Sequence, residues 1–269
     1  MARQKGPPLK YVGTLGDIRH FKIKGNEGYF AGLTGGPTAE QIATDPAFQR
    51  TRENMNEFGG CAMVGKSVRV GLASLMKNMA DSQVTGRLTA IMKKINLEDG
   101  SEARGRRAVL VSAVPNYLKG FDFNRFTSFN GAFNAPFTIT PAGSRDSSTL
   151  DVPAFNPLNY LNIPAGATHF RIINAISVLS DYEFNTTTKV YEPKDASLNE
   201  LKDVQYSAYL PVDSVTPPLV SLVATLPGSP TMTTDVSVLN SIGIEFYQEV
   251  GSNYYVFAQG NALKISEIF

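Results

Sequence analysis

The strongest constraint on the fold is a repeated alternation of apolar and polar residues in the second half of the chain. In the segments 150–154, 204–210, 220–226 and 242–246, every second side chain is apolar. A period of two places successive side chains on opposite faces of a strand. Glycines and prolines separate these segments, and helical patterns between them are lacking. Residues 108–269 are therefore predicted to form an antiparallel β-sandwich, with either an immunoglobulin-like or a jelly-roll-like strand order.

Three details extend this prediction. Residues 133–140 also alternate and are expected to form a strand. In HFRIINAISVLSDYEF (169–184), the alternation changes parity near Ile172 and Ile173, which predicts a bulge or a strand that crosses a corner. A hairpin is expected across residues 250–253, where a glycine lies between two alternating runs.

The N-terminal segment has a different pattern. Residues 17–33 contain two short apolar runs on either side of Gly25-Asn26-Glu27-Gly28, and this spacing indicates a β-hairpin. The preceding Gly6-Pro7-Pro8 favours an extended arm. A hairpin alone is at best marginally stable in water, so it needs a surface to dock on, in the same chain or in a neighbour. We therefore predict an N-terminal arm and hairpin over residues 1–37.

Residues 38–107 are predicted to be a small helical region, which makes the chain α+β. Thr38 and Gln41 match a capping box, and Asp45 before Pro46 provides a cap and a suitable first helical residue.

Three helices are expected in this region. The first is expected to end at a Gly59-Gly60 break and to bury Phe48, Met55 and Phe58. The second has apolar residues at steps of three and four, and these are Cys61, Val64, Val68, Leu72, Leu75 and Met79. Asp81 is expected to cap the third, whose buried residues are Val84, Leu88, Ile91 and Ile95.

The octapeptide GCAMVGKS (60–67) matches the phosphate-loop pattern G-x-x-x-x-G-K-[ST]. The matching residues are Gly60, Gly65, Lys66 and Ser67. A true phosphate loop follows a buried strand and opens a helix, but the preceding RTRENMNEFG is a charged helical pattern. Cys61 and Val64 also lie in phase with the apolar stripe of the following helix. We interpret the match as chance, and expect a helix in which Gly65 packs against another helix while Lys66 and Ser67 face solvent.

Other catalytic or metal chemistry finds little support. The only two histidines, His20 and His169, are too few for a histidine metal cluster. Cys61 lies in the apolar stripe, so we expect a small core residue rather than a nucleophile paired with His169. The carboxylates at 98–102 lack the spacing of an EF-hand loop. The sequence therefore predicts no enzyme, no cofactor and no metal site.

The distribution of charge and the absence of targeting signals indicate possible partners and the cellular compartment. Residues 1–107 carry 17 Lys and Arg against 10 Asp and Glu, whereas residues 108–269 carry 8 against 14. Basic and acidic halves can attract each other between subunits, and a basic half can hold nucleic acid. The chain has no secretory signal, no apolar run of membrane length and a single cysteine, which together predict a cytoplasmic protein without a membrane partner.

Six segments, spread over nearly the whole chain, carry a family resemblance. They are GTLGDIRHFKIKG (13–25), TDPAFQRTRENMNEFGG (44–60), DSQVTGRLTAIMKKI (81–95), LKGFDFN (118–124), IPAGATHFRI (163–172) and IGIEFYQEV (242–250). In these segments the chain resembles a family of uncharacterised proteins of the Bacteroidetes. The resemblance implies a bacterial source and the same three-part layout, but no activity, cofactor or site residue.

These features favour binding or assembly over catalysis. The leading hypothesis is a structural subunit that forms homo-oligomers and self-assembles into a filament, tube or shell, with the hairpin arm adding to a neighbour's sheet. The alternative is a β-sandwich module that binds a carbohydrate or a protein partner, with tyrosines as stacking surfaces. A nucleic-acid partner ranks below both, because no recognition-helix or RNA-binding signature accompanies the basic residues.

Overall fold

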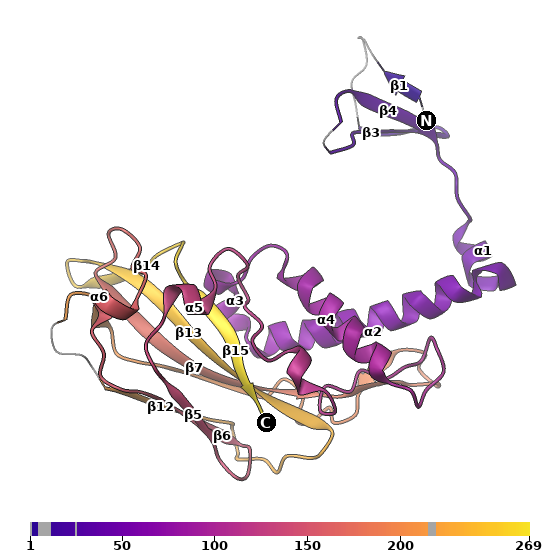
Figure 1. Ribbon diagram of the computed structural model, residues 1–269. Coiled ribbons are helices and arrows are strands. Elements are labelled where there is room, and N and C mark those ends of the chain that lie inside the picture. Colours follow the sequence, from indigo (N-terminus) through magenta and orange to yellow (C-terminus); the bar gives the residue numbers. More distant parts are fainter. Residues whose placement is uncertain (1, 5–11, 25, 215–218) are drawn as a thin grey trace. The chain divides into compact units, whose positions relative to one another are not determined.

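The computed structural model describes residues 2–4, 12–24, 26–214 and 219–269. It divides the chain into two compact units, an N-terminal unit (Met1–Arg52) and a C-terminal unit (Glu53–Phe269). The fold is α+β, as predicted from the sequence, with an N-terminal hairpin and a large antiparallel sheet (Figure 1).

The N-terminal unit contains a four-stranded antiparallel sheet in the order β1-β4-β3-β2. Strand β3 (Ile18–Phe21) pairs with β4 (Tyr29–Leu33), which confirms the predicted hairpin. Strands β2 (Gly13–Leu15) and β1 (Ala2–Gln4) pair with β3 and β4, respectively. The extended arm expected at residues 6–8 lies outside the described residues.

Two capped helices follow in the same unit. Helix α1 (Ala39–Thr44) begins with the predicted capping box, in which Thr38 Oγ1 accepts from Gln41 N at 3.1 Å and Gln41 Oε1 accepts from Thr38 N at 2.8 Å. Asp45 then caps the 3-10 helix η1 (Pro46–Phe48) by accepting from Ala47 N at 2.8 Å.

Helix α2 (Gln49–Gly71) continues through Gly59 and Gly60, so the predicted break there is wrong. The helical path is interrupted only at Leu72, before α3 (Ala73–Met79). The predicted apolar stripe is confirmed, because every one of its residues is at most 1% exposed.

The outer face of α2 contradicts the sequence prediction. Met55 and Phe58 were expected in the core, but they are exposed. Their positions on the helical wheel lie opposite the buried stripe, so α2 carries apolar side chains on two faces.

Helix α4 (Val84–Glu98) packs beside α2 in the same core. Asp81 was expected to cap this helix, but the N-cap is Gln83, which makes no side-chain cap hydrogen bond. Asp81 Oδ1 instead accepts from Gln83 N at 2.6 Å in the turn before α4. Val84, Leu88 and Ile95 are buried, and Ile91 is partly buried against the same cluster.

The C-terminal unit contains two antiparallel sheets that face each other. The larger has the order β10-β7-β13-β14, with β11 beside β7 and β15 beside β13. Its strands are β7 (His169–Ser180), β10 (Lys202–Tyr206), β11 (Leu210–Pro211), β13 (Val236–Val250), β14 (Asn253–Val256) and β15 (Ala262–Ile268). The smaller sheet consists of β5 (Thr138–Pro141), β6 (Ser147–Val152) and β12 (Val220–Thr225). The outlying elements are the hairpin of β8 (Tyr182–Phe184) and β9 (Tyr191–Pro193), the helices α5 (Phe129–Ala132) and α6 (Pro157–Tyr160), and η2 (Pro115–Tyr117).

Two strand predictions need correction and one is confirmed. The strand expected over residues 133–140 is shorter, because the chain leaves α5 at Phe133 and pairs only from Thr138. The hairpin at 250–253 forms as predicted, with Val250 opposite Asn253.

The parity change in β7 has a different cause from the predicted bulge. The register between β7 and β13 is continuous from His169 to Ser180. Both faces of β7 are covered: Ile173, Ala175 and Leu179 lie in the core with the helices, and the alternate residues face the smaller sheet. A strand buried on both faces loses its alternation without any bulge.

The helices and the large sheet share one core. The stripe of α2, α3 and α4 packs against the helix-side face of β7, β13 and β15. Because of this shared core, most of the helical region belongs to the same compact unit as the sheets, and the boundary between the two units lies at residue 52. The sequence pattern had instead predicted three parts, with boundaries at residues 37 and 107. An amphipathic helix must bury its apolar face, and here the large sheet covers the inner apolar face of α2, α3 and α4.

Candidate functional site

The phosphate-loop match lies in the middle of helix α2. Gly60, Gly65, Lys66 and Ser67 all have helical neighbours on both sides, as the phase of the apolar stripe indicated. A phosphate cradle requires free backbone N–H groups at a helix start, and the N–H groups of a helix interior donate to carbonyls one turn earlier.

The glycines of α2 mark places where other elements approach closely. A Cβ at Gly60 would lie 2.4 Å from the Tyr191 ring, and one at Gly65 would lie 3.4 Å from Leu88 Cβ on α4. The prediction that Gly65 packs against another helix is confirmed. These glycines therefore have a packing role that accounts for two of the four matching residues.

Ser67 was expected to face solvent, and this expectation is wrong. Its Oγ is buried and lies 2.7 Å from both Tyr182 Oη and Glu200 Oε1, while Asn199 Nδ2 donates to it at 3.3 Å. Lys66 is exposed, as predicted. The hydroxyl is thus engaged in linking α2 to the β-rich part of the unit.

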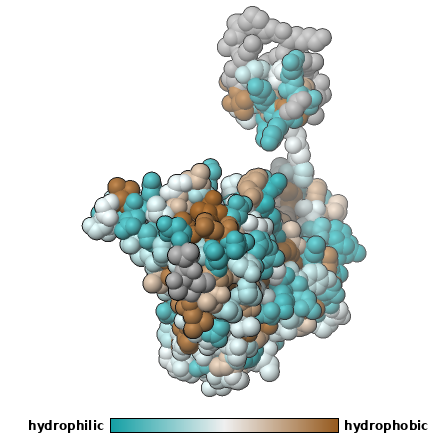
Figure 2. Space-filling view, turned by 60° about the vertical axis from the view of Figure 1, so that its left-hand side comes forward, coloured by the Kyte–Doolittle hydropathy of each residue, from teal (hydrophilic) through white to brown (hydrophobic). Residues whose placement is uncertain are grey.

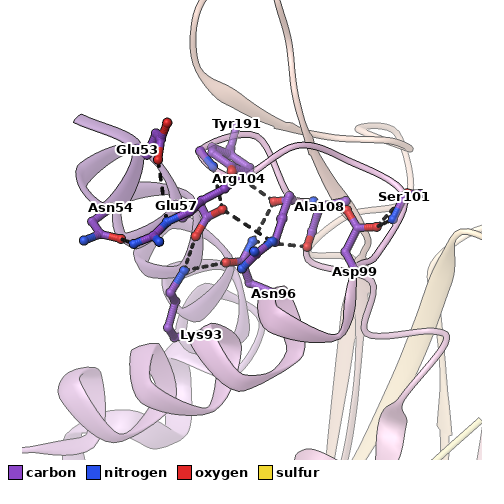
Figure 3. Close-up of polar contacts among 12 residues, drawn as sticks. Glu53, Asn54, Glu57, Lys93, Asn96, Asp99, Ser101, Arg104, Ala108 and Tyr191 are labelled. Atoms are coloured by element: carbon purple, nitrogen blue, oxygen red, sulfur yellow. Dashed lines mark hydrogen bonds and ion pairs between the residues drawn. The ribbon is translucent and has the colours of Figure 1, made fainter. Parts of the chain in front are cut away.

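A polar cluster around Glu57 brings several charged groups together between α2, α4 and the loop that follows α4 (Figure 3). Glu57 is 1% exposed on α2, and its carboxylate accepts from Lys93 Nζ on α4 and from Gly105 N at 2.7 Å. Arg107 Nε lies 4.0 Å from the same carboxylate. The loop between α4 and residue 108 is therefore held against both helices by one buried charge.

Neighbouring residues secure the rest of this loop. Asn96 Nδ2 donates to Arg107 O at 2.6 Å, and Tyr191 Oη donates to the same oxygen at 2.9 Å. Asp99 accepts from Ser101 N at 2.8 Å and from Ala108 N at 2.7 Å. The carboxylates of Glu57 and Asp99 each accept at least two hydrogen bonds, so the cluster holds the loop in place as a structural clamp.

The pKa values support this interpretation. Burial alone would raise the pKa of Glu57, but hydrogen bonds from Lys93 and Gly105 and the nearby charges of Lys93 and Arg107 hold it below its usual range. Sequence reasoning missed this residue, although Glu57 lies four residues before Cys61 and so falls in phase with the buried stripe. A carboxylate that stays ionised and fully paired is a poor general acid or base.

Three arginines of the loop after α4, Arg104, Arg106 and Arg107, make contacts within the chain. Arg104 Nη2 donates to Asn54 Oδ1 at 2.9 Å and its Nε lies 3.6 Å from Glu53. Arg106 lies over the Phe184 ring at 5.9 Å. Of these contacts, those of Arg104 with Glu53 and of Arg107 with Glu57 place a carboxylate beside the guanidinium and so offset part of the positive charge of this loop.

Cys61 and His169 do not form a pair. Cys61 is fully buried among apolar residues, and desolvation raises the pKa of its thiol to about 12. His169 instead lies 3.8 Å from Glu249 and packs against Tyr254. Within the described ranges, no group of three or more His, Cys, Asp or Glu side chains is placed to hold a metal ion.

The N-terminal unit exposes an apolar ladder, defined as Leu15, Ile18 and Leu33. Leu15 is opposite Ile18 and Ile18 is opposite Leu33, so the three side chains lie side by side on one face of the sheet. They are 69%, 44% and 81% exposed. Among the described residues of this unit, no hydrophobic side chain is buried.

The C-terminal unit exposes a second apolar surface, the outer stripe of α2, defined as Met55, Phe58, Gly59, Ala62 and Met63. Met55, Phe58 and Met63 are 59%, 60% and 43% exposed. Between the stripe and the β8–β9 hairpin lies a groove of about 180 Å³, whose hairpin side includes Phe184, Val190 and Tyr191. The space-filling view likewise shows hydrophobic side chains at the surface of both units (Figure 2).

Comparisons with protein-family models, with curated proteins and with solved structures gave no match. No helix in the described part of the chain is both long and apolar enough to cross a bilayer.

Proposed function

We propose that the protein is a non-enzymatic structural subunit, cytoplasmic and bacterial, that self-assembles into a filament, tube or shell. The observation that carries this proposal is the N-terminal unit: its described residues bury no hydrophobic side chain, yet the unit exposes the apolar ladder.

The described residues of this unit leave the apolar ladder without a covering layer. Small sheets need a covering layer on their apolar face, and a chain of about 50 residues is marginal even when it has a core. The ladder therefore requires a partner surface. In an assembly, that surface belongs to the next copy. Each added copy then covers the ladder of one neighbour and exposes a ladder of its own to the following copy.

The charges of the two units favour the same arrangement. Residues 1–52 contain 8 Lys and Arg against 4 Asp and Glu, a net charge of +4, and residues 53–269 contain 17 against 20, a net charge of −3. Opposite net charges attract at long range and speed up encounters between copies. A contact between two different patches does not close on itself unless the rotation permits, so it extends into rings or filaments.

The experiment is light scattering over a wide concentration range, followed by electron microscopy of the same samples. We expect the wild type to assemble as concentration rises. Leu33→Glu should abolish assembly, and Leu97→Glu, at an exposed leucine on α4 outside both apolar surfaces, should leave it intact. A wild type that stays monomeric at every concentration would overturn the proposal.

A second function, binding of a carbohydrate or protein by the sandwich, is favoured by one cluster. The Arg171 guanidinium lies 4.4 Å from the centre of the Tyr206 ring and 4.8 Å from that of Tyr209, and Tyr209 stacks on Tyr254 at 3.9 Å. Arg171 Nε donates to Ser207 O at 2.8 Å, which holds the guanidinium beside the two tyrosine rings. Glycan-array or pull-down binding by a monomer, lost in Arg171→Ala, would favour this function over assembly.

A further inference from the structure

We propose that the apolar ladder of one copy packs on the outer stripe of α2 in the next copy. This inference rests on the proposed assembly and names the two surfaces that form its contact. It commits the stripe to one occupant, the N-terminal sheet of a second copy of this chain.

The outer stripe has the properties of a covered helix face. Helix α2 is apolar on two opposite faces, and a helix that is apolar on both sides is normally buried on both. Its inner face already packs against α4 and the large sheet, as the burial of Cys61, Val64 and Val68 shows. Among the described residues of the C-terminal unit, the outer face borders only the β8–β9 hairpin across the groove, and Met55, Phe58 and Met63 stay exposed.

The shape of the stripe suits a flat partner. A Cβ at Gly59 would meet no atom within 4 Å, so the backbone of α2 is open to close approach at the middle of the stripe. The methionines on either side, Met55 and Met63, have flexible side chains that adapt to a partner surface. A three-residue ladder on a sheet presents such a flat apolar surface.

The ladder is the occupant that fits the stripe, because each of the two is an exposed apolar surface that the other can cover. Its three aliphatic side chains and the three large side chains of the stripe are all between 43% and 81% exposed. Packing them together covers both surfaces at once. Six partly exposed side chains make a modest contact, so we expect assembly to depend strongly on concentration.

Cysteine cross-linking tests the contact. A Leu33→Cys chain with an affinity tag and a Met63→Cys chain without a tag are mixed as dilute solutions, concentrated, and treated with a short bis-maleimide. Cys61 is fully buried and should not react, so it can remain. We expect a tagged–untagged cross-linked dimer at least tenfold more abundant than with Leu97→Cys in place of Met63→Cys. The pair Ile18→Cys and Met55→Cys repeats the test at a second point.

Other outcomes identify other occupants and overturn the inference. Cross-linking only within a Leu33→Cys/Met63→Cys double variant would place the ladder on its own chain. Cross-linking only between two Met63→Cys copies would assign the stripe to the α2 helix of a second copy. Microscopy of the same samples separates this inference from the proposed function: filaments or shells without the Leu33–Met63 cross-link overturn this contact alone, whereas monomers overturn both.

Discussion

Alanine substitutions at two adjacent glycines should have opposite effects on stability. Gly59 and Gly60 both lie inside α2, so each substitution improves helix propensity by about 1 kcal/mol. At Gly59 the new methyl group meets no atom within 4 Å. We therefore expect Gly59→Ala to stabilise the protein by about 1 kcal/mol.

At Gly60 the same methyl group meets the Tyr191 ring. Its distance from the nearest ring carbon would be 2.4 Å, far inside van der Waals contact. Tyr191 is almost fully buried and its hydroxyl is held by Arg107 O, so the ring cannot move aside without breaking that hydrogen bond. Overpacking of this kind costs about 1–3 kcal/mol. Because the propensity gain is common to both variants, this cost is the expected difference between them.

The measurement is urea unfolding followed by circular dichroism, with wild type, Gly59→Ala and Gly60→Ala at the same low micromolar concentration. A difference of about 2 kcal/mol corresponds to roughly 4–8 °C in the melting temperature of a unit of this size. If both substitutions destabilise equally, the two glycines form a helix break and the continuous α2 is refuted. If both stabilise equally, the close contact between Gly60 and Tyr191 is refuted.

Three further predictions follow from the core of the C-terminal unit. Burial opposes ionisation of Glu57, Asp81 and Asp99, but hydrogen bonds to all three carboxylates lower their pKa values, and nearby cations add to this at Glu57 and Asp81. The stabilisation that these carboxylates contribute is therefore fully present above their unfolded-state pKa values of about 4, and it is lost as pH falls through their folded-state pKa values. We therefore expect Glu57→Gln to make the urea midpoint less dependent on pH in the acid range. Cys61, with a pKa of about 12, should resist a thiol reagent in the native state and react fully in urea, and prompt native reaction would contradict its burial. A fluorescent ATP analogue should bind neither wild type nor Lys66→Ala, and wild-type binding that is lost in Lys66→Ala would restore the phosphate-loop interpretation.

The parts of the fold that could be predicted are those whose pattern is local. Alternation with a period of two located most strands, and steps of three and four located the buried stripe from Cys61 to Met79. The uninterrupted helix at Gly59 and Gly60 could not be predicted, because a glycine pair is locally a helix breaker. The reason for Gly60 lies in Tyr191, which is more than a hundred residues away.

The clamp around Glu57 was missed for a related reason. Its carboxylate lies in a charged segment that is typical of a solvated helix face, and its donors come from α4 and the following loop. Only the helical phase it shares with Cys61 and Val64 signalled burial. Phase identifies the face on which a side chain lies, whereas the partners on that face depend on the tertiary fold.

Helical phase also connects the clamp with the proposed assembly. Helix α2 has to satisfy a buried charge and an apolar stripe on its inner face, and three glycines there (Gly60, Gly65 and Gly71) allow neighbouring elements to approach. These requirements do not explain the apolar residues of the outer face, since Met55, Phe58 and Met63 contribute nothing to that core. A solvated outer face would favour Lys, Glu or Gln at the same positions. The inner core therefore gives no reason for the apolar outer stripe, whereas the proposed contact with the ladder of a neighbouring copy would account for it.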